Sequence, residues 1–170
     1  MLKVRNKNDT RILIHNGDFI GGRNLLLDTA NKSFTTNDSN GYSQSGDFEF
    51  SCLPSEFQGK TITISARFDV TNGVSIDGSS NHRMGWEMEV RYSDGTKKYV
   101  GVWMEFSNNP RTEHKRLSRT YTLDNKPVVG IFSPRIFHQY FSSESATVSE
   151  VKLEFGSIVT DWTPAPEDYS

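Results

Sequence analysis

Residues 85–106 read GWEMEVRYSDGTKKYVGVWMEF, and the fold class follows from their pattern. Apolar and polar side chains alternate before and after residues 93–96, which contain the Asp94-Gly95 pair typical of a tight reversal. The stretch is therefore predicted to form two antiparallel strands joined by a hairpin. Because successive side chains of a strand point to opposite faces, the hairpin is expected to have one apolar and one polar face.

The same period of two recurs along most of the chain, and no segment has the three-and-four spacing of an amphipathic helix. Further strands are predicted at residues 46–52, 60–70, 116–123, 127–132 and 148–155. Loops are predicted for the long polar joins at residues 71–84, 107–115 and 133–147. This pattern predicts an all-β fold, an antiparallel β-sandwich with its loops gathered at the ends of the sheets.

Composition limits the partners that the chain is expected to have. Its 170 residues suit one ordinary domain, and a formal net charge of −2 provides no general attraction for nucleic acid or for an anionic membrane. No stretch has the length and apolarity of a membrane span or a secretory signal. On the grounds of charge and of this missing apolar stretch, we expect neither nucleic acid nor a membrane as a partner. Cys52 is the sole cysteine, which excludes an internal disulfide and a thiolate metal cluster.

Residues 151–168 read VKLEFGSIVTDWTPAPED. This segment resembles the closing segment of carbohydrate-binding-type jelly rolls in tail and baseplate proteins of bacteriophages that infect Gram-positive bacteria. The family pattern is roughly Leu-Glu-x-Gly, a few small residues, and then Asp/Ser-Trp-x-Pro-Ala-Pro-Glu-Asp. Residues 23–26 are similar to the family's opening, and residues 115–123 are similar to its penultimate strand. The sequence departs from the family at Phe155, where Lys is common, and at His114, where Trp is usual.

The resemblance implies a jelly-roll domain over residues 23–163, preceded by an entry segment at residues 1–22. Pro164 and Pro166 lack backbone donors, so residues 164–170 are predicted to be a linker. No cofactor is expected, and a structural calcium ion is implied only through the resemblance. Oxygen donors occur at residues 38–40 and 77–78, but neither group fills a recognisable calcium loop.

The candidate site follows from strand parity. If the apolar sides of the hairpin and of residues 60–70 pack inward, one outer face gathers aromatic and charged side chains. These predicted carbohydrate-binding residues are Trp103, Tyr99, Arg67, Asp69, Glu87, Glu89, Arg91 and Glu105. An outward aromatic plane can stack on a pyranose while carboxylate and guanidinium groups bond its hydroxyls. The alternative is a solvated sheet of cross-strand ion pairs, with Trp103 packed under a loop or a neighbouring chain.

The remaining sequence features point less clearly to a site. Residues 137–141 place three aromatic side chains in a predicted loop, either as a binding or oligomer contact or as a plug at one end of the sandwich. The four histidines have no metal-ligand spacing, so no metal site is predicted. The chain also lacks a Gly-x-Ser-x-Gly elbow and a phosphate-binding glycine loop, which argues against an enzyme.

Together these features predict a non-catalytic carbohydrate-binding module of a phage virion, in its tail or baseplate. Its partners would be a host cell-surface polysaccharide and other virion tail proteins, and its location the virion and the host surface during adsorption. One alternative is a decoration or assembly domain without a ligand, which an oligomeric state in solution would favour. A glycan hydrolase that uses two of the outer carboxylates is a third reading.

Overall fold

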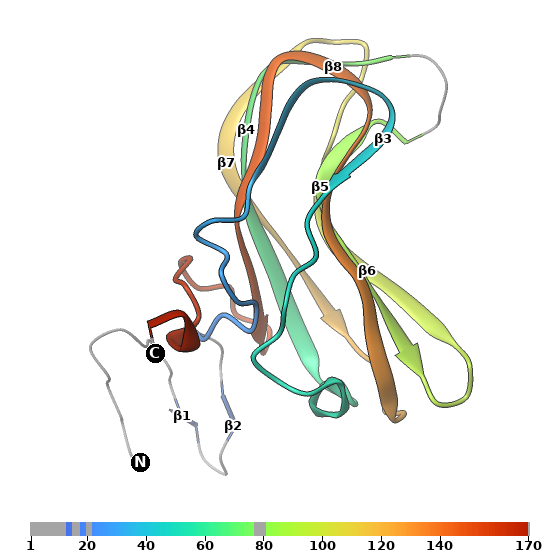
Figure 1. The fold of residues 1–170 in the computed structure, drawn as a ribbon, viewed down its shortest axis with the longest axis vertical. Coiled ribbons are helices and arrows are strands. Elements are labelled where there is room, and N and C mark those ends of the chain that lie inside the picture. Colours follow the sequence, from blue (N-terminus) through green and yellow to red (C-terminus); the bar gives the residue numbers. More distant parts are fainter. Residues whose placement is uncertain (1–12, 15–17, 20–21, 77–80, 170) are drawn as a thin grey trace.

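Antiparallel strands make up most of the computed structural model, which describes residues 13–14, 18–19, 22–76 and 81–169 (Figure 1). The elements are β1 (Leu13–Ile14), β2 (Asp18–Phe19), β3 (Phe34–Ser45), η1 (Pro54–Phe57), β4 (Thr61–Ser75), β5 (Arg83–Tyr92), β6 (Lys97–Glu105), β7 (Arg111–Thr122), β8 (Val128–Phe155) and η2 (Pro166–Tyr169). In the described residues the helical segments are the two short 3-10 turns, η1 and η2. The predicted all-β antiparallel sandwich is confirmed.

One long strand, β8, belongs to both layers of the sandwich. The strand order is β6-β5-β8-β4-β7, and β3 also pairs with β8. Residues 128–139 of β8 pair with β5, whereas residues 141–155 pair with β4. Figure 1 shows β8 bending over between these two halves. The first layer is therefore β6-β5 with the first half of β8, and the second layer is β7-β4 with the second half.

The bend of β8 corrects the prediction of a loop at residues 133–147. These residues form continuous strand, and Tyr140 at the bend adopts a left-handed backbone conformation with φ of 46°. The aromatic run at residues 137–141 is not an exposed loop, because Phe137, His138 and Phe141 are buried. Phe141 stacks on Phe106 with ring centroids 4.3 Å apart. The polar residues around this run suggested a loop. The strand instead continues through the run, and its aromatic side chains are buried where β8 passes from one layer to the other.

Strand β3 was not predicted, because its sequence FTTNDSNGYSQS lacks apolar alternation. It pairs with β8 on both sides of the bend, from Phe34 opposite Val148 to Ser45 opposite Ile136. Backbone pairing with a long neighbour is sufficient to form this strand without an apolar face of its own.

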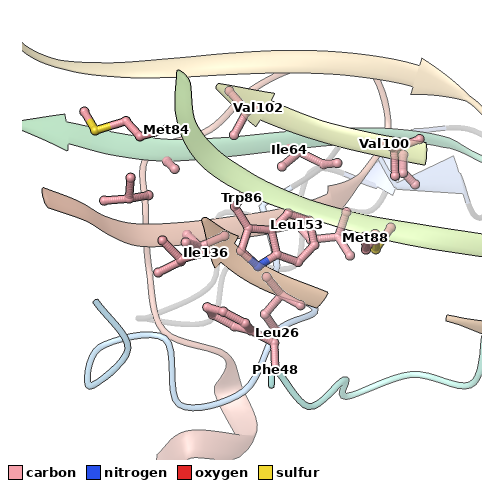
Figure 2. Packing of buried hydrophobic residues seen from close by; sticks show 14 of the residues in the cluster. Leu26, Phe48, Ile64, Met84, Trp86, Met88, Val100, Val102, Ile136 and Leu153 are labelled. Atoms are coloured by element: carbon pink, nitrogen blue, oxygen red, sulfur yellow. The ribbon is translucent and has the colours of Figure 1, made fainter. Parts of the chain in front are cut away.

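The core lies between the two layers (Figure 2). Ile64 and Leu153 come from the second layer, and Trp86, Val102 and Ile136 come from the first. All five side chains are buried, and strand parity predicted this for Ile64, Trp86 and Val102 of β4, β5 and β6. The segment before β3 and the segment after it close this core with Leu26 and Phe48. The Phe48 ring stands nearly perpendicular to the Trp86 indole at a centroid distance of 5.8 Å.

The outer edges of β6 and β7 are joined by side chains. The Tyr121 hydroxyl donates to the Gly101 carbonyl at 2.7 Å and accepts from the Gly101 amide at 3.3 Å. Lys98 Nζ donates to the carbonyl of Thr122 at 2.7 Å. These bonds satisfy polar backbone groups of the two edges and hold β7 beside β6.

Residues 164–169, predicted as part of a linker, pack on the domain instead. Ala165 is buried, and Asp168 accepts hydrogen bonds from the amides of Asp28 and Ala165. The buried Asn24 amide donates to the carbonyls of Val151 and Thr163, which ties the opening segment to the closing one. Most of the predicted entry segment 1–22 lies outside the described residues. Within it, β1 pairs with β2 antiparallel.

Candidate functional site

The outward side chains of β5, β6 and the first half of β8 form one continuous surface, which we call the hairpin face. It comprises Lys97, Tyr99, Trp103 and Glu105 of β6, Arg83, Glu87, Glu89 and Arg91 of β5, and Phe132, Arg135, Phe137 and Gln139 of β8. Strand pairing arranges these residues in rows across the three strands. Because neighbouring strands lie about 4.8 Å apart, the two outer members of a row are about 10 Å apart at the backbone.

The structure brings together six of the eight predicted site residues. Glu87, Glu89, Arg91, Tyr99, Trp103 and Glu105 all belong to the hairpin face. Arg67 and Asp69 lie on the outer face of the second layer, on the other side of the core. Parity along β4 shows correctly that these two side chains point outward. It does not show that the bend of β8 turns the outer face of β4 away from that of β5.

On the second layer, Arg67 and Asp69 form an ion pair within β4, and Asp69 also faces His114 of the neighbouring strand β7. Arg67 Nε donates to Asp69 Oδ2 at 2.8 Å, and His114 Nδ1 lies 3.0 Å from Asp69 Oδ1. Partial burial alone would raise the pKa of Asp69, but the hydrogen bonds from Arg67 and His114 bring its pKa below the usual value. These side chains bind one another and are separate from the hairpin face.

The row Tyr99–Glu89–Phe132 places two aromatic rings on either side of a carboxylate. Tyr99 is 59% exposed and Phe132 is 40% exposed, whereas Glu89 between them is only 7% exposed. The guanidinium of Arg91 lies over the Phe132 ring at 3.7 Å from its centroid, and Lys97 Nζ lies 5.2 Å from the Tyr99 centroid. Tyr99 is thus the most exposed aromatic ring of this row.

Hydrogen bonds keep the Glu89 carboxyl ionised. The Tyr99 hydroxyl makes the largest contribution, and bonds from Arg91 Nε and Lys97 Nζ add to it, so the pKa of Glu89 falls from 4.5 to about 2. This carboxylate therefore fixes the Tyr99 hydroxyl and two cations in one arrangement. An ordered set of this kind needs little reorganisation when a ligand binds.

Replacement of Glu89 by Gln is expected to lower the free energy of unfolding at neutral pH by about 1–2 kcal/mol, because bonds to a charged acceptor are lost. The folded-state pKa is depressed, so this stabilisation is complete above pH 4.5 and disappears as the pH falls through about 2. Urea unfolding of wild type and Glu89→Gln across this range should show their difference shrinking on acidification. A difference that is independent of pH would contradict the assignment.

Trp103 points away from the core as predicted, since its strand neighbours Val102 and Met104 are buried. Its ring is half-buried and already has contacts within the protein. The guanidinium carbons of Arg119 and Arg83 lie 3.8 and 4.8 Å from the indole centroid. Trp103 Nε1 donates to Glu105 Oε1 at 3.1 Å. The Tyr99 ring is therefore more open to solvent than the Trp103 ring.

Sequence reasoning missed the β8 side of this surface. Arg135 pairs with Glu87 at 3.0 Å and also lines a pocket of about 260 Å³ with Gly46, Asp47 and Ser133. Phe132 was placed at the end of a predicted strand, and Arg135 was placed in a predicted loop, so neither was assigned to a face. No local signal identifies the pocket, because its walls come from residues almost ninety positions apart in the chain.

The described residues contain no group of three His, Cys, Asp or Glu side chains that could hold a metal ion. The calcium candidate at residues 77–78 lies outside the described residues, and only the backbone is described at residues 38–40. Within the described part of the chain, no helix has the length and apolarity needed to cross a membrane.

The strand order defines the class of this chain as an antiparallel β-sandwich. No protein-family model matches the sequence, and no curated protein matches it. Among solved structures, the chain is similar to the tripod from the baseplate of bacteriophage Tuc2009, with a TM-score of 0.54 and 19% identity over 86% of this chain. It spans 59% of that longer chain. At this identity the likeness shows the fold.

Two carbohydrate-binding modules are also among the similar structures. One is the C-terminal family 22 module of Clostridium thermocellum Xyn10B, with a TM-score of 0.40 and 13% identity over 83% of this chain and 84% of that chain. The other is a xylan-binding domain of Paenibacillus barcinonensis Xyn10C, with a TM-score of 0.34 and 10% identity over 81% and 98%. The likeness to the baseplate tripod agrees with the fold that the closing motif implied.

Proposed function

We propose that this chain is a non-catalytic carbohydrate-binding module of a phage tail or baseplate, and that its hairpin face adheres to a host cell-wall glycan. The observation that carries the proposal is the row Tyr99–Glu89–Phe132, in which a largely exposed ring stands beside an ionised, hydrogen-bonded carboxylate. An aromatic plane beside fixed polar groups suits the apolar face and the hydroxyls of a sugar ring.

The rest of the hairpin face extends this surface. The Glu87–Arg135 ion pair lies one row away from Tyr99 and leads to the pocket beside Asp47. At about 260 Å³ this pocket is slightly smaller than the roughly 300–1,000 Å³ of typical small-molecule sites. We therefore assign it one sugar unit or a substituent of a longer chain that runs along the hairpin face.

The carboxylates of the hairpin face are arranged for recognition and not for hydrolysis. A glycosidase needs a carboxylic acid that keeps its proton, which requires a raised pKa. The pKa of Glu89 is shifted in the opposite direction, Glu87 is paired with Arg135, and Glu105 is bonded to Trp103. A face of paired carboxylates supports a binding module.

Such a module would act in many copies. A single shallow face gives weak affinity, and display of several copies on a virion raises the overall avidity without new contacts. The proposed partners are therefore the host cell-surface polysaccharide and the neighbouring tail proteins that hold the copies together. The proposed location is the virion, and the host surface during adsorption.

Replacement of Tyr99 by Ala is expected to weaken binding to purified host cell-wall polysaccharide by about tenfold, since an aromatic contact contributes about 0.5–1.5 kcal/mol beyond its buried area. Isothermal titration of wild type and variant measures this loss. Tyr169→Ala is the matched control, because Tyr169 is 69% exposed and lies in η2, away from the hairpin face. Equal affinity of wild type and Tyr99→Ala would overturn the assignment of this face, and released reducing ends would instead indicate a hydrolase.

A further inference from the structure

Arg83 and Arg119 contact the Trp103 ring, and we call these three residues the Trp103 cluster. Neither arginine has a carboxylate partner in the part of the chain that the structure describes. Arg119 contacts the Trp103 ring, and Arg83 contacts the rings of Trp103 and Phe137 and the side chain of Gln139. The remainder of the hairpin face is different. Arg91 and Lys97 are paired with Glu89, and Arg135 is paired with Glu87.

The position of Arg83 is built into the first layer. Trp103, Gly85 and Phe137 form one row, and Arg83 belongs to the next row. Its guanidinium carbon lies 4.8 Å from the Trp103 centroid and 5.3 Å from the Phe137 centroid. Arg83 Nε also donates to Gln139 Oε1 at 3.4 Å. Two rings and an amide thus hold this guanidinium before any ligand arrives.

Gly85 makes this arrangement possible. A Cβ atom at this position would lie 2.2 Å from the Val102 carbonyl oxygen and 2.7 Å from Trp103 Cβ. Any side chain here would displace the strand that carries Trp103. The glycine therefore keeps Trp103 close to β5 and leaves the space above the row to Arg83.

Arg119 reaches the same ring from the second layer. Its strand β7 lies beside β6 through the bonds of Tyr121 to Gly101, two residues along each strand from Arg119 and Trp103. The guanidinium carbon of Arg119 is 3.8 Å from the indole centroid. Two positive charges from different layers therefore converge on one aromatic ring.

The chemistry of this cluster favours an anion. A guanidinium that stacks on a ring uses its flat face and keeps its N–H groups in the plane, where they can bind a carboxylate or phosphate in bidentate fashion. The carboxylate nearest in the strand ladder is Glu105, opposite Arg83, and it accepts a hydrogen bond from Trp103 Nε1. Two cations against this one carboxylate leave one positive charge in excess.

We propose that Arg83, Arg119 and Trp103 form a subsite for an acidic group, a phosphate or a carboxylate, carried by the glycan. The proposal rests on the proposed function for its biological ligand, and it narrows that ligand to an acidic polysaccharide. The two arginines bind the acidic group, and the indole holds their charged planes in place. Tyr99, at the other end of β6, contacts the sugar ring.

The subsite can be tested on the intact chain with small probes: sn-glycerol 3-phosphate, D-galacturonate and, as a neutral control, methyl galactoside. The indole N–H signal of Trp103, assigned by its loss in Trp103→Phe, is followed by NMR during each titration. We expect at least one anion to shift this signal and the neutral sugar to leave it unchanged. The double variant Arg83→Gln/Arg119→Gln should lose at least tenfold in affinity for that anion, and the two anions distinguish a phosphate from a carboxylate source.

Two further variants sharpen this test. Glu105→Gln keeps an acceptor for Trp103 and removes the opposing charge, so affinity for the anion should rise about threefold or more. Arg67→Gln removes an arginine of the other layer and should leave the titration unchanged. No shift with either anion at about 50 mM, or an equal shift in the double variant, would overturn the subsite. Equal polysaccharide affinity of wild type and Tyr99→Ala, together with an intact anion response, would instead remove only the proposed function.

Discussion

Replacement of Lys152 by Met is expected to lower the free energy of unfolding by about 3–5 kcal/mol, because it leaves a buried carboxylate without its cation. Lys152 and Glu154 are both fully buried, with Nζ and Oε2 3.7 Å apart. A loss of this size is a large part of the roughly 5–15 kcal/mol that stabilises a typical domain.

The reason for the large effect is the set of bonds that the two side chains make. Lys152 Nζ donates to the Gly22 carbonyl, the Thr160 hydroxyl and the Asp161 carbonyl at 2.6–3.0 Å. Glu154 accepts from the amides of Gly22 and Thr160. Through these bonds the pair fastens both the segment that enters the domain and the segment that leaves it to β8. Burial lowers the pKa of Lys152, which the nearby Glu154 opposes.

Urea unfolding of Lys152→Met, Glu154→Gln and the double variant measures this prediction. The double variant should be less destabilised than the sum of the single ones, because no unpaired charge remains buried. Hydrogen exchange at the Gly22 and Thr160 amides should accelerate in Lys152→Met, since the segments that the pair holds would open more often. A cost below about 1 kcal/mol for Lys152→Met, or simple additivity, would show that the pair contributes little.

Replacement of Gly101 by Ala is expected to lower the free energy of unfolding by about 2–3 kcal/mol, through forced movement of the backbone. The added Cβ would lie 2.4 Å from the Trp86 carbonyl oxygen and 3.0 Å from Glu87 Cα. Strand β6 cannot move away from β5 without disturbing the bonds of Tyr121, on its other edge, to the Gly101 amide and carbonyl. Gly101 is therefore held from both sides by groups that cannot turn aside.

Gly130→Ala is the matched control for this variant. Its added Cβ would also meet a close atom, Phe132 Cε2 at 2.6 Å, but that atom is the end of a side chain that can rotate. Thermal or urea unfolding should therefore show a loss of less than about 1 kcal/mol for Gly130→Ala. If both variants lose the same stability, close approach to the backbone is not the cause.

Much of the fold could be predicted from local patterns. The alternation in residues 85–106 and the Asp94-Gly95 pair gave the hairpin of β5 and β6, with the Tyr92 amide bonded to the Thr96 carbonyl at 2.9 Å. Parity placed Trp86 and Ile64 inside and Trp103 and Tyr99 outside, and the structure agrees. These predictions succeed because the direction of a side chain along a strand depends only on its position in that strand.

The long strand β8 could not be predicted in this way. Two strands were predicted at its ends, and a loop was predicted where it bends. Its middle alternates poorly, because the side that faces the core changes where the strand passes from one layer to the other and where the register shifts. Alternation correctly predicted a strand at residues 148–155, but not the burial of Lys152 and Glu154, since charge at these positions is compatible with burial only through partners elsewhere in the chain.

The candidate site, too, was predicted in part from local patterns and missed in part. Six of its eight predicted residues share the hairpin face, since they lie on the two strands of one hairpin and their side chains point to the same side of it. Arg67 and Asp69 were added on the assumption that outward sides of different strands form one surface, which fails when a bent strand separates them. Phe132, Arg135, Arg83 and Arg119 were missed, because their roles depend on which strands meet.

The amino-acid sequence by itself determined the β class, the hairpin and the inward or outward direction of side chains on regular strands, because these depend on contacts between residues close in the chain. Only the tertiary structure decided which outward sides share a surface, which rings are covered by guanidinium groups, and how two buried charges are satisfied. Those outcomes depend on contacts between residues as far apart as Gly22 and Lys152, and no local pattern contains that information.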